Sequence, residues 1–306
     1  MPLPHCSPPR WPANIPAARF ASRLRTDHPR SCRFALIGLP DDTGVRLNNG
    51  RPGARAGPDA FRAALARYGV AEPDGWDWPT VFDAGDVVPA APRDDSRPAL
   101  VAALHETHDR VTAAVRALID AGLTPFAIGG GHDLTFPFVR AAASTFGPLD
   151  AVYLDAHLDV RAEPGSGMPF RRLIETNAVR SLHVHGLNAL ANAREHVAYF
   201  RAHAGIVHPP HSPAGVFPSP TATGGAFLSI DLDVLDAAHA PGVSALNPCG
   251  WTVAQAEAWA LAAGRTPHVR CADIMELNPA HDDDGRTARV AAHLFLSFLR
   301  GFAERP

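Results

Sequence analysis

The 306-residue chain contains no lysine, so its 28 basic residues are all arginines. An enzyme that uses pyridoxal phosphate needs a lysine for its Schiff base, and a P-loop needs one to bind phosphate. Neither class of protein fits this sequence. The chain also lacks an excess of charge of either sign, because its net charge is −3. That balance gives no reason to expect nucleic acid or an anionic membrane as a partner.

Cysteines and long apolar runs are also scarce. The four cysteines form no CxxC pair and are too few for a disulfide framework in a chain of this length. No apolar run approaches the roughly 20 residues of a transmembrane helix, and the proline-rich segment 1–20 lacks the apolar core of a signal peptide. We therefore expect a protein of the reducing cytoplasm. The sequence leaves open whether the protein forms a homo-oligomer.

From about residue 31 the chain alternates short apolar strands with amphipathic helices. Strands are predicted at 33–38, 80–86, 124–130, 150–155, 179–186, 225–231 and 268–277. Helices are predicted at 57–69, 98–122, 136–147, 188–205, 252–264 and 284–302. This alternation predicts a mostly parallel sheet with helices on both faces. We expect a proline-rich N-terminal extension at 1–30, one α/β domain at 31–306, and an irregular proline-rich loop at 208–225.

The stretch DAHLD, residues 155–159, follows one of the apolar strands. Asp155, His157 and Asp159 occupy every second position, so in an extended chain their side chains would point to the same face. Two carboxylates at such a short distance repel each other, and burying them is costly. The pattern therefore predicts that a cation binds between them.

Three more polar motifs follow predicted strands: GGGHD (129–133), SIDLD (229–233) and a glutamate, Glu276. Ligands bind open parallel sheets at the carboxyl ends of the strands, so these motifs are expected to meet at one edge. The candidate metal ligands are His132, Asp155, His157, Asp159, Asp231 and Asp233. Two imidazoles and four carboxylates suffice for two divalent cations and favour manganese over thiolate-bound zinc. Two ions roughly 3.5–4 Å apart can deprotonate a bridging water.

Each motif also has a simpler structural explanation. A GGG sequence commonly forms only a tight turn, and a single histidine such as His132 is commonly a structural residue. His183 and His185 share a strand face, where packing or a polar rim is expected. The run Asp282–Asp284 is expected to be solvated near the start of the last helix, where negative charge suits the helix dipole. The shared position at strand ends is what favours a functional site.

Together, GGGHD, YLDAHLD, SIDLDVLD and the glutamate of IMELNP resemble the signature motifs of the ureohydrolase family, which includes arginases, agmatinases and formimidoylglutamases. The resemblance covers about residues 33–303. It implies a three-layer α/β/α sandwich with a binuclear Mn²⁺ site. One metal would be held by His132, Asp155, Asp159 and Asp231, and the other by Asp155, His157, Asp231 and Asp233, so that Asp155 and Asp231 bridge. Asp159 would also orient the bridging hydroxide, and Glu276 would pair with an amidine or guanidine cation.

Four segments resemble the formimidoylglutamase branch in particular, at 41–58, 165–175, 240–245 and 278–292. The expected reaction is hydrolysis of formimidoylglutamate to glutamate and formamide, in histidine degradation. This substrate carries two carboxylates, so its site should provide arginine forks. Arg161 is the first candidate, with Ser166 and Gly167 nearby. Weaker arginine candidates are Arg46, Arg51, Arg171 and Arg172.

Two positions depart from the pattern of that branch. Asp133 stands where glutamate is usual, and Met168 stands where threonine is common. Both bear on the choice of substrate and leave the metal ligands intact. One alternative is therefore a ureohydrolase that acts on a guanidine compound such as agmatine, guanidinobutyrate or arginine and releases urea. The other is a metal-binding relative without catalytic activity.

Overall fold

A computed structural model describes residues 3–27, 29, 31–69, 78–209, 217 and 224–305. Most of the loop expected at 208–225 lies outside these residues. In the described part of the chain, no helix is long and apolar enough to cross a membrane. All four cysteines are free thiols, and Cys271 is buried in the core.

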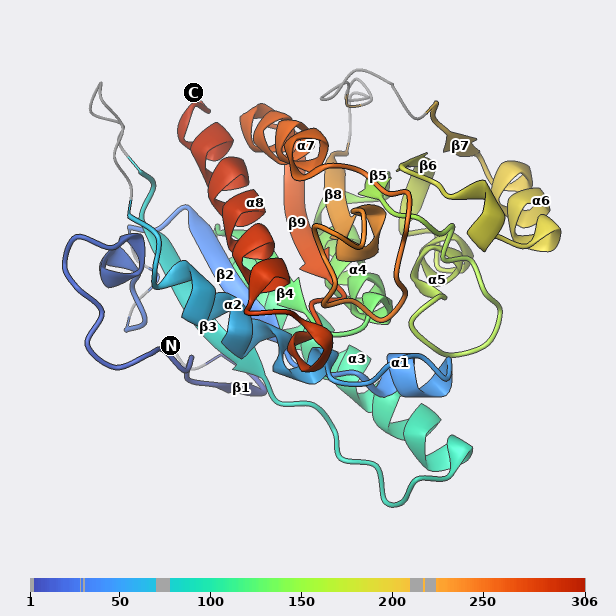
Figure 1. Cartoon of the computed structure of the whole chain (residues 1–306), viewed down its shortest axis with the longest axis horizontal. Helices are drawn as coiled ribbons and strands as arrows, with labels where there is room; N and C mark the ends of the chain where they lie inside the picture. Colours follow the sequence, from blue (N-terminus) through green and yellow to red (C-terminus); the bar gives the residue numbers. More distant parts are fainter. Residues whose placement is uncertain are drawn as a thin grey trace.

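Among the described residues, one sheet of nine strands runs through the molecule in the order β1-β3-β2-β4-β9-β8-β5-β6-β7 (Figure 1). The strands are β1 (Cys6–Ser7), β2 (Phe34–Leu39), β3 (Val81–Val87), β4 (Thr124–Gly129), β5 (Leu149–Leu154), β6 (Val179–His185), β7 (Gly205–Val207), β8 (Ala226–Asp231) and β9 (Val269–Met275). Only β1 is antiparallel to its neighbour; the other paired strands are parallel. The predicted mostly parallel sheet is confirmed.

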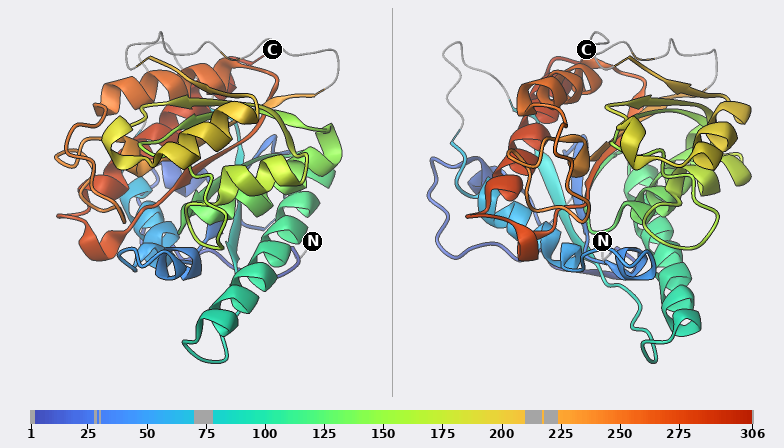
Figure 2. Two further views of the ribbon diagram at one scale, coloured as in Figure 1. Left: turned by 90° about the vertical axis from the view of Figure 1, so that its right-hand side faces the viewer. Right: turned by 45° about the vertical axis from the view of Figure 1, so that its right-hand side comes forward.

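Helices cover both faces of this sheet, and Figure 2 shows the strands between the two helix layers. The helices are α1 (Thr43–Leu47), α2 (Gly57–Leu65), α3 (Arg97–Asp120), α4 (Thr135–Phe146), α5 (Pro169–Glu175), α6 (Arg194–Ala202), α7 (Val253–Arg265) and α8 (Arg286–Ala303). Side chains of α2, α7 and α8 form one apolar core, and those of α3 to α6 form the other. Two cores form because successive side chains of a strand point to opposite faces of the sheet. In β2, Phe34 and Leu36 belong to the first core, and Ala35 and Ile37 belong to the second. The predicted three-layer α/β/α sandwich is confirmed.

The N-terminal arm packs against the β3 edge of the sheet. Cys6 and Ser7 pair with the end of β3, and the indole Nε1 of Trp11 donates a hydrogen bond to Asp83 Oδ2 at 3.0 Å. Asp83 in turn receives two hydrogen bonds from the buried Arg62 guanidinium. The arm thus follows the surface of the domain. Its boundary at residue 30 stays a prediction.

The predicted helix at 188–205 is shorter in the structure, because two asparagines bend the chain before it. The side-chain oxygen of Asn188 accepts a hydrogen bond from the Leu190 N–H at 3.0 Å. The Asn192 amide donates to the carbonyls of Ala156 and Asn188. A short 3₁₀ turn at Ala189–Ala191 results, and α6 begins only at Arg194. Asparagine side chains compete with the helix backbone in this way. Helices α1 and α5 and strands β1 and β7 were not predicted.

Candidate metal centre

The predicted metal ligands and Glu276 meet at the carboxyl ends of four adjacent strands. His132 follows β4, Asp155 follows β5, Asp231 ends β8, and Glu276 follows β9. These strands are neighbours in the order β4-β9-β8-β5. The sheet topology therefore brings together motifs that lie up to about 140 residues apart in the chain, at the edge where parallel sheets bind ligands.

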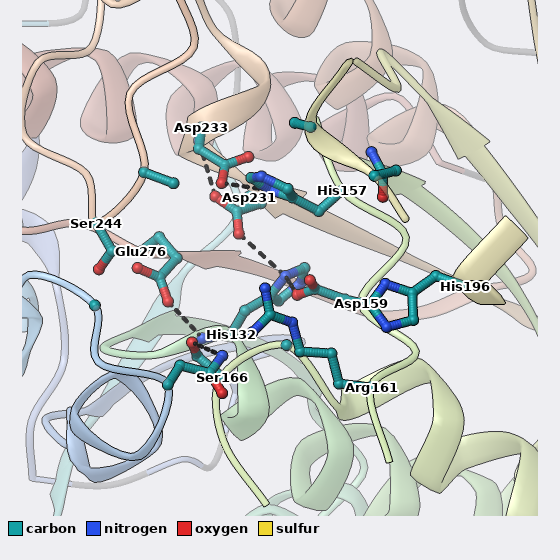
Figure 3. A pocket seen from close by; sticks show the side chains of 16 residues that line it. His132, His157, Asp159, Arg161, Ser166, His196, Asp231, Asp233, Ser244 and Glu276 are labelled. Carbon is teal, nitrogen blue, oxygen red and sulfur yellow. Dashed lines mark hydrogen bonds and ion pairs between the residues drawn. The ribbon is translucent and has the colours of Figure 1, made fainter. Parts of the chain in front are cut away.

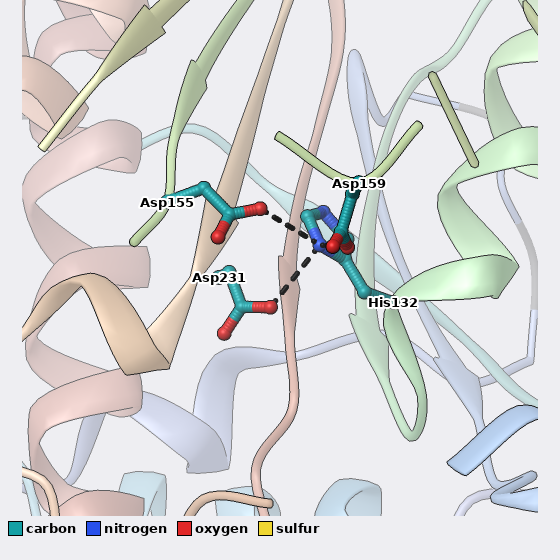
Figure 4. A group of neighbouring side chains, drawn as sticks. All are labelled: His132, Asp155, Asp159 and Asp231. Atoms are coloured by element: carbon teal, nitrogen blue, oxygen red, sulfur yellow. Dashed lines mark ion pairs between the residues drawn. The ribbon is translucent and has the colours of Figure 1, made fainter. Parts of the chain in front are cut away.

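His132 stands at the centre of the first ligand group, which Figure 4 shows from close by. Its Nδ1 lies 3.3 Å from Asp155 Oδ2, 2.9 Å from Asp159 Oδ2 and 3.1 Å from Asp231 Oδ2. One atom from each of these four residues lies within 4.8 Å of all the others. The Nδ1 atom is buried without a well-formed hydrogen bond. This arrangement fits a cation held by one imidazole nitrogen and three carboxylates.

A second ligand group consists of Asp155, His157 and Asp233, whose ligand atoms also lie within 4.8 Å of one another. His157 Nδ1 is 2.9 Å from Asp233 Oδ2 and 3.5 Å from Asp155 Oδ1. Asp155 belongs to both groups through its two different oxygens, as a bridging carboxylate would. Asp231 belongs to the first group only, and its role as a second bridge stays a prediction.

Residues 155–159 do not continue the extended geometry that would place every second side chain on one face. Strand β5 ends at Leu154, and the chain then turns so that Asp155 Oδ1 accepts a hydrogen bond from the His157 N–H at 2.6 Å. The SIDLD motif makes the same turn, since Asp231 Oδ1 accepts from the Asp233 N–H at 2.8 Å. Asparagine and aspartate readily form such local turns. Asp159 completes the site with a left-handed φ of 49°.

A hydrogen-bonded chain behind His132 fixes its orientation. His132 Nε2 lies 3.0 Å from Ser229 Oγ, and the Ser229 hydroxyl donates to Asp273 Oδ1 at 2.6 Å. Thr135 Oγ1 donates to the other oxygen of Asp273 at 3.0 Å. With Nε2 as the donor, Nδ1 is left free to bind a metal. Sequence reasoning missed Asp273, although an aspartate inside the apolar strand VRCADIM was a usable signal.

The charge balance of the cluster calls for a cation. Burial raises the pKa of Asp155 to about 6, and its like-charged neighbours add to the effect. Burial and the adjacent Asp233 and Asp155 carboxylates also raise the pKa of Asp231 well above its ordinary value. Burial alone would lower the pKa of His157, but Asp233 and Asp155 raise it to about 12. Buried carboxylates in such excess need positive charge, which divalent ions on these oxygen and nitrogen donors provide.

Metal binding should strengthen as pH rises, because the ligands must release protons to bind a cation. The raised pKa values of His157 and Asp155 mean that protons compete with the metal at neutral pH. We expect a tighter apparent Kd for Mn²⁺ at pH 8.5 than at pH 6.5. Titration followed by the electron paramagnetic resonance signal of free Mn²⁺ would measure it. An affinity independent of pH would contradict this view of the ligands.

Five of the six candidate ligands, all except Asp155, line a pocket of about 230 Å³, into which Glu276 also points (Figure 3). Glu276 Oε1 accepts a hydrogen bond from the His132 N–H at 3.0 Å, and its Oε2 is free to contact a ligand. Burial raises the pKa of Glu276 to about 7, although Ser244 and the His132 N–H favour its charged form. Its backbone has a left-handed φ of 65°. A cation in the pocket would stabilise this buried carboxylate.

Arg161 lines the same pocket, and the described residues offer its guanidinium no hydrogen bond or ion pair. The four weaker arginine candidates are all engaged elsewhere. Arg46 pairs with Asp95, Arg51 with two backbone carbonyls, and Arg171 and Arg172 with Glu175. Arg161 is therefore the candidate whose cation remains available for a ligand.

The turn at Ser166 and Gly167 supports Arg161. The Arg161 backbone N–H donates to the Gly167 carbonyl at 2.8 Å. With its amide oxygen facing this turn, Asn48 accepts from the Ser166 hydroxyl at 3.0 Å and from the Gly167 N–H at 2.8 Å. Sequence reasoning missed Asn48, which comes from the end of α1, more than a hundred residues away.

Gly167→Ala should displace Arg161. A Cβ atom at this position would lie 2.9 Å from Arg161 Cδ, which is too close, so the flexible arginine side chain has to shift. For a substrate with carboxylates we expect KM to rise by roughly 10-fold, the loss of one charged hydrogen bond, with kcat and bound Mn²⁺ nearly unchanged. Gly69→Ala is the matched control, because its Cβ would meet nothing closer than 3.6 Å. An unchanged KM would show that Arg161 does not contact the substrate.

The two positions that depart from the formimidoylglutamase pattern have structural partners. Asp133 is buried behind His132, with its Oδ2 2.8 Å from Nε2 of His108 on α3. Met168 packs in a small apolar cluster with side chains of α1 and α3. Neither position lines the pocket.

The remaining histidine and acidic motifs lie apart from the ligand groups. His185 stacks on His208 and Trp259 with ring centroids 4.1 and 4.2 Å away, so packing is its role. Asp282 accepts hydrogen bonds from the Thr287 and Ala288 N–H groups at the start of α8. Its neighbours at 283–284 are exposed, as expected.

Comparison with known proteins agrees with this geometry. Residues 32–300 match the model of the arginase family. The chain belongs to the arginase family. A formimidoylglutamase of Nocardia farcinica is 37% identical over 289 residues, which cover 87% of this chain and 85% of that protein. A formimidoylglutamase of Ralstonia nicotianae is 34% identical over 316 residues, which cover 96% and 91%.

Solved structures share this arginase-family fold. The crystal structure of Trypanosoma cruzi formiminoglutamase with Mn²⁺ has a TM-score of 0.80 and 29% identity, and the match covers 94% of this chain and 99% of that one. Formimidoylglutamase of Bacillus subtilis, at 24% identity, has a TM-score of 0.82 over 94% and 93% of the two chains, which shows the common fold. The recognised ureohydrolase resemblance is thus confirmed.

Proposed function

We propose that this protein hydrolyses N-formimidoyl-L-glutamate to L-glutamate and formamide with two Mn²⁺ ions, as a step of histidine degradation in the cytoplasm. The similarity to formimidoylglutamases over most of the chain supports the reaction. The Mn²⁺-containing relative and the two ligand groups support the metal. The observation that carries the proposal is the free Arg161 guanidinium in a pocket that is otherwise acidic.

The polarity of the pocket matches this substrate. At neutral pH formimidoylglutamate has a cationic amidine at one end and two carboxylates at the other. Glu276 and the ligand aspartates form an acidic inner end, and Arg161 supplies positive charge next to it. Ser166 and Gly167 shape the wall on which Arg161 lies. Agmatine, which has no carboxylate, would leave the Arg161 guanidinium without a partner.

Glu276 is the residue that orients the amidine. Its Oε1 is fixed by the His132 N–H, so its Oε2 can accept a hydrogen bond from an amidinium nitrogen. This contact favours the cationic form of the amidine, whose carbon is the more electrophilic toward hydroxide. The two Mn²⁺ ions, when bound, supply the positive charge that deprotonates a water at neutral pH.

Asp159 is the residue that transfers the proton from the attacking water. Its carboxylate lines the pocket, and its side chain is 12% exposed, whereas that of Asp155 is fully buried. It can take a proton from the attacking water and pass it to the glutamate nitrogen. The bond between the amidine carbon and that nitrogen then breaks. The oxygen of water leaves in formamide, and glutamate departs as the free amine.

Product analysis tests this function. The Mn²⁺-loaded protein is offered formimidoylglutamate, agmatine, guanidinobutyrate and arginine separately, and glutamate, formamide, ammonia and urea are assayed. We expect equal amounts of glutamate and formamide from the first substrate and no urea from the others. Urea from a guanidine substrate would favour another branch of the family. Ammonia with formylglutamate would mean that the other C–N bond is cleaved, and two bound metals without any turnover would favour a non-catalytic role.

A further inference from the structure

The metal pocket continues into a second, outer cavity of about 590 Å³. In the part of the chain that the structure describes, Asn48, Arg161 and His196 are the three residues that line both cavities. They form the neck between the two. A substrate whose amidine reaches the metal ligands can extend past these three residues toward the outer cavity.

Two of the three neck residues have side chains without any hydrogen bond among the described residues. Asn48 holds the Ser166–Gly167 turn with its amide oxygen, and its NH2 is a further, uncharged donor. Arg161 has no side-chain partner among the described residues, and neither has the partly exposed imidazole of His196. Figure 3 shows both side chains directed at the pocket, Arg161 from the loop after β5 and His196 from the first turn of α6.

We infer that His196 is a second carboxylate contact and makes the site selective for a dicarboxylate. This inference rests on the proposed function. Two carboxylates that leave water each need a hydrogen-bond donor, because an unpaired one is costly. Arg161 supplies one donor group, and the imidazole N–H of His196, at the start of α6, supplies the other.

The positions of the two residues in the chain indicate which carboxylate each binds. Arg161 lies two residues after Asp159, so its backbone is within about 7 Å of the backbone of Asp159, whose carboxylate is at the reacting end. It suits the α-carboxylate, which is next to the scissile nitrogen. His196 belongs to α6, on which Glu195 and Tyr199 line the outer cavity. It suits the γ-carboxylate, which extends two carbons further out. Ala162 and Glu163 after Arg161 line the outer cavity as well, so the assignment rests on the short chain distance from Arg161 to Asp159.

The outer arginines are already engaged. Arg97 donates to the Leu47 carbonyl at 3.2 Å. Arg171 donates to Glu175 at 2.9 Å, and its guanidinium lies 4.2 Å from the ring centre of Tyr199. Arg171→Gln is therefore a matched control that removes a cation from the outer cavity without touching the neck.

The test combines variants with shortened substrates. Wild type, His196→Leu, Arg161→Gln and Arg171→Gln are assayed with formimidoylglutamate and two analogues. N-formimidoyl-4-aminobutyrate lacks the α-carboxylate, and N-formimidoyl-L-2-aminobutyrate lacks the γ-carboxylate. We expect His196→Leu to lower kcat/KM by roughly 10- to 100-fold for both substrates that keep the γ-carboxylate, which is the range for a lost charged hydrogen bond. It should leave kcat/KM for N-formimidoyl-L-2-aminobutyrate unchanged.

Arg161→Gln should give the mirror pattern, with its loss confined to substrates that keep the α-carboxylate. His196→Gln, which keeps an N–H donor, should restore part of the activity, and all variants should bind two Mn²⁺ per chain. Equal losses for all three substrates, or no loss, in His196→Leu would overturn the inference. An Arg171→Gln variant that lowers kcat/KM as much as His196→Leu does would also overturn it. Any of these results would overturn the role of His196 and leave the proposed function intact. If the wild-type protein makes no glutamate from formimidoylglutamate, both the proposed function and the role of His196 are wrong.

Discussion

Replacing Asp155 with asparagine is expected to abolish binding of both metals and, with it, turnover. Asp155 is fully buried and contributes one oxygen to each ligand group. Loss of residues that only support ligands commonly lowers metal affinity by about 10- to 100-fold, and the loss of a shared ligand should exceed that. Manganese per chain after buffer exchange, measured by atomic spectroscopy, checks the expectation. Two ions retained by Asp155→Asn would contradict it.

The metal-free form of the same variant separates a lost ligand from a lost fold. Burial raises the pKa of Asp155 to about 6, so its charged form destabilises the metal-free protein at pH 7. Asparagine removes that charge, and the metal-free variant should therefore melt at a higher temperature than metal-free wild type. Asp283→Asn is the matched control, since Asp283 is an exposed aspartate outside both ligand groups. It should change neither metal content nor melting temperature.

Glu276→Gln is expected to lower kcat/KM by about 10²- to 10³-fold, the usual effect of removing one group that stabilises the transition state. Glutamine keeps an oxygen to accept the His132 N–H, but it loses the negative charge that faces the amidinium. Manganese content should remain at the wild-type level, because Glu276 belongs to neither ligand group.

Steady-state kinetics with formimidoylglutamate, together with metal analysis, measures this effect. Ser244→Ala is the comparison variant, because Ser244 lines the same pocket and favours the charged form of Glu276 without carrying a charge of its own. It should lower kcat/KM far less. A Glu276→Gln enzyme with near-normal kcat/KM would show that the amidine binds elsewhere.

The layers and the clustering of the candidate metal ligands could be predicted from the sequence because both depend on short-range patterns. Alternating strands and helices indicated the sandwich, and the positions of His132, Asp155 and Asp231 after strands indicated a common edge. The turn that follows Leu154 was not predicted, since an extended chain and a side-chain-bonded turn share the same residue pattern. The residues that hold the ligands and the Ser166–Gly167 turn in place by hydrogen bonds were missed for another reason.

Those supports depend on contacts between distant parts of the chain. Ser229 joins His132 to Asp273, and Asn48 holds a turn 118 residues further on. No local pattern records such pairs. The neck formed by Arg161 and His196 likewise appears only once the loop after β5 and the start of α6 lie side by side.

The left-handed backbone at Asp159 and Glu276 has a consequence for engineering this protein. Outside glycine that conformation costs of order 1 kcal/mol or more, and Glu276 adds the cost of a buried carboxylate, shown by its pKa of about 7. Glu276→Gly relieves both costs and removes the group that orients the substrate. A library selected only for heat resistance would therefore favour chains that no longer work, so such a selection has to score turnover at every round.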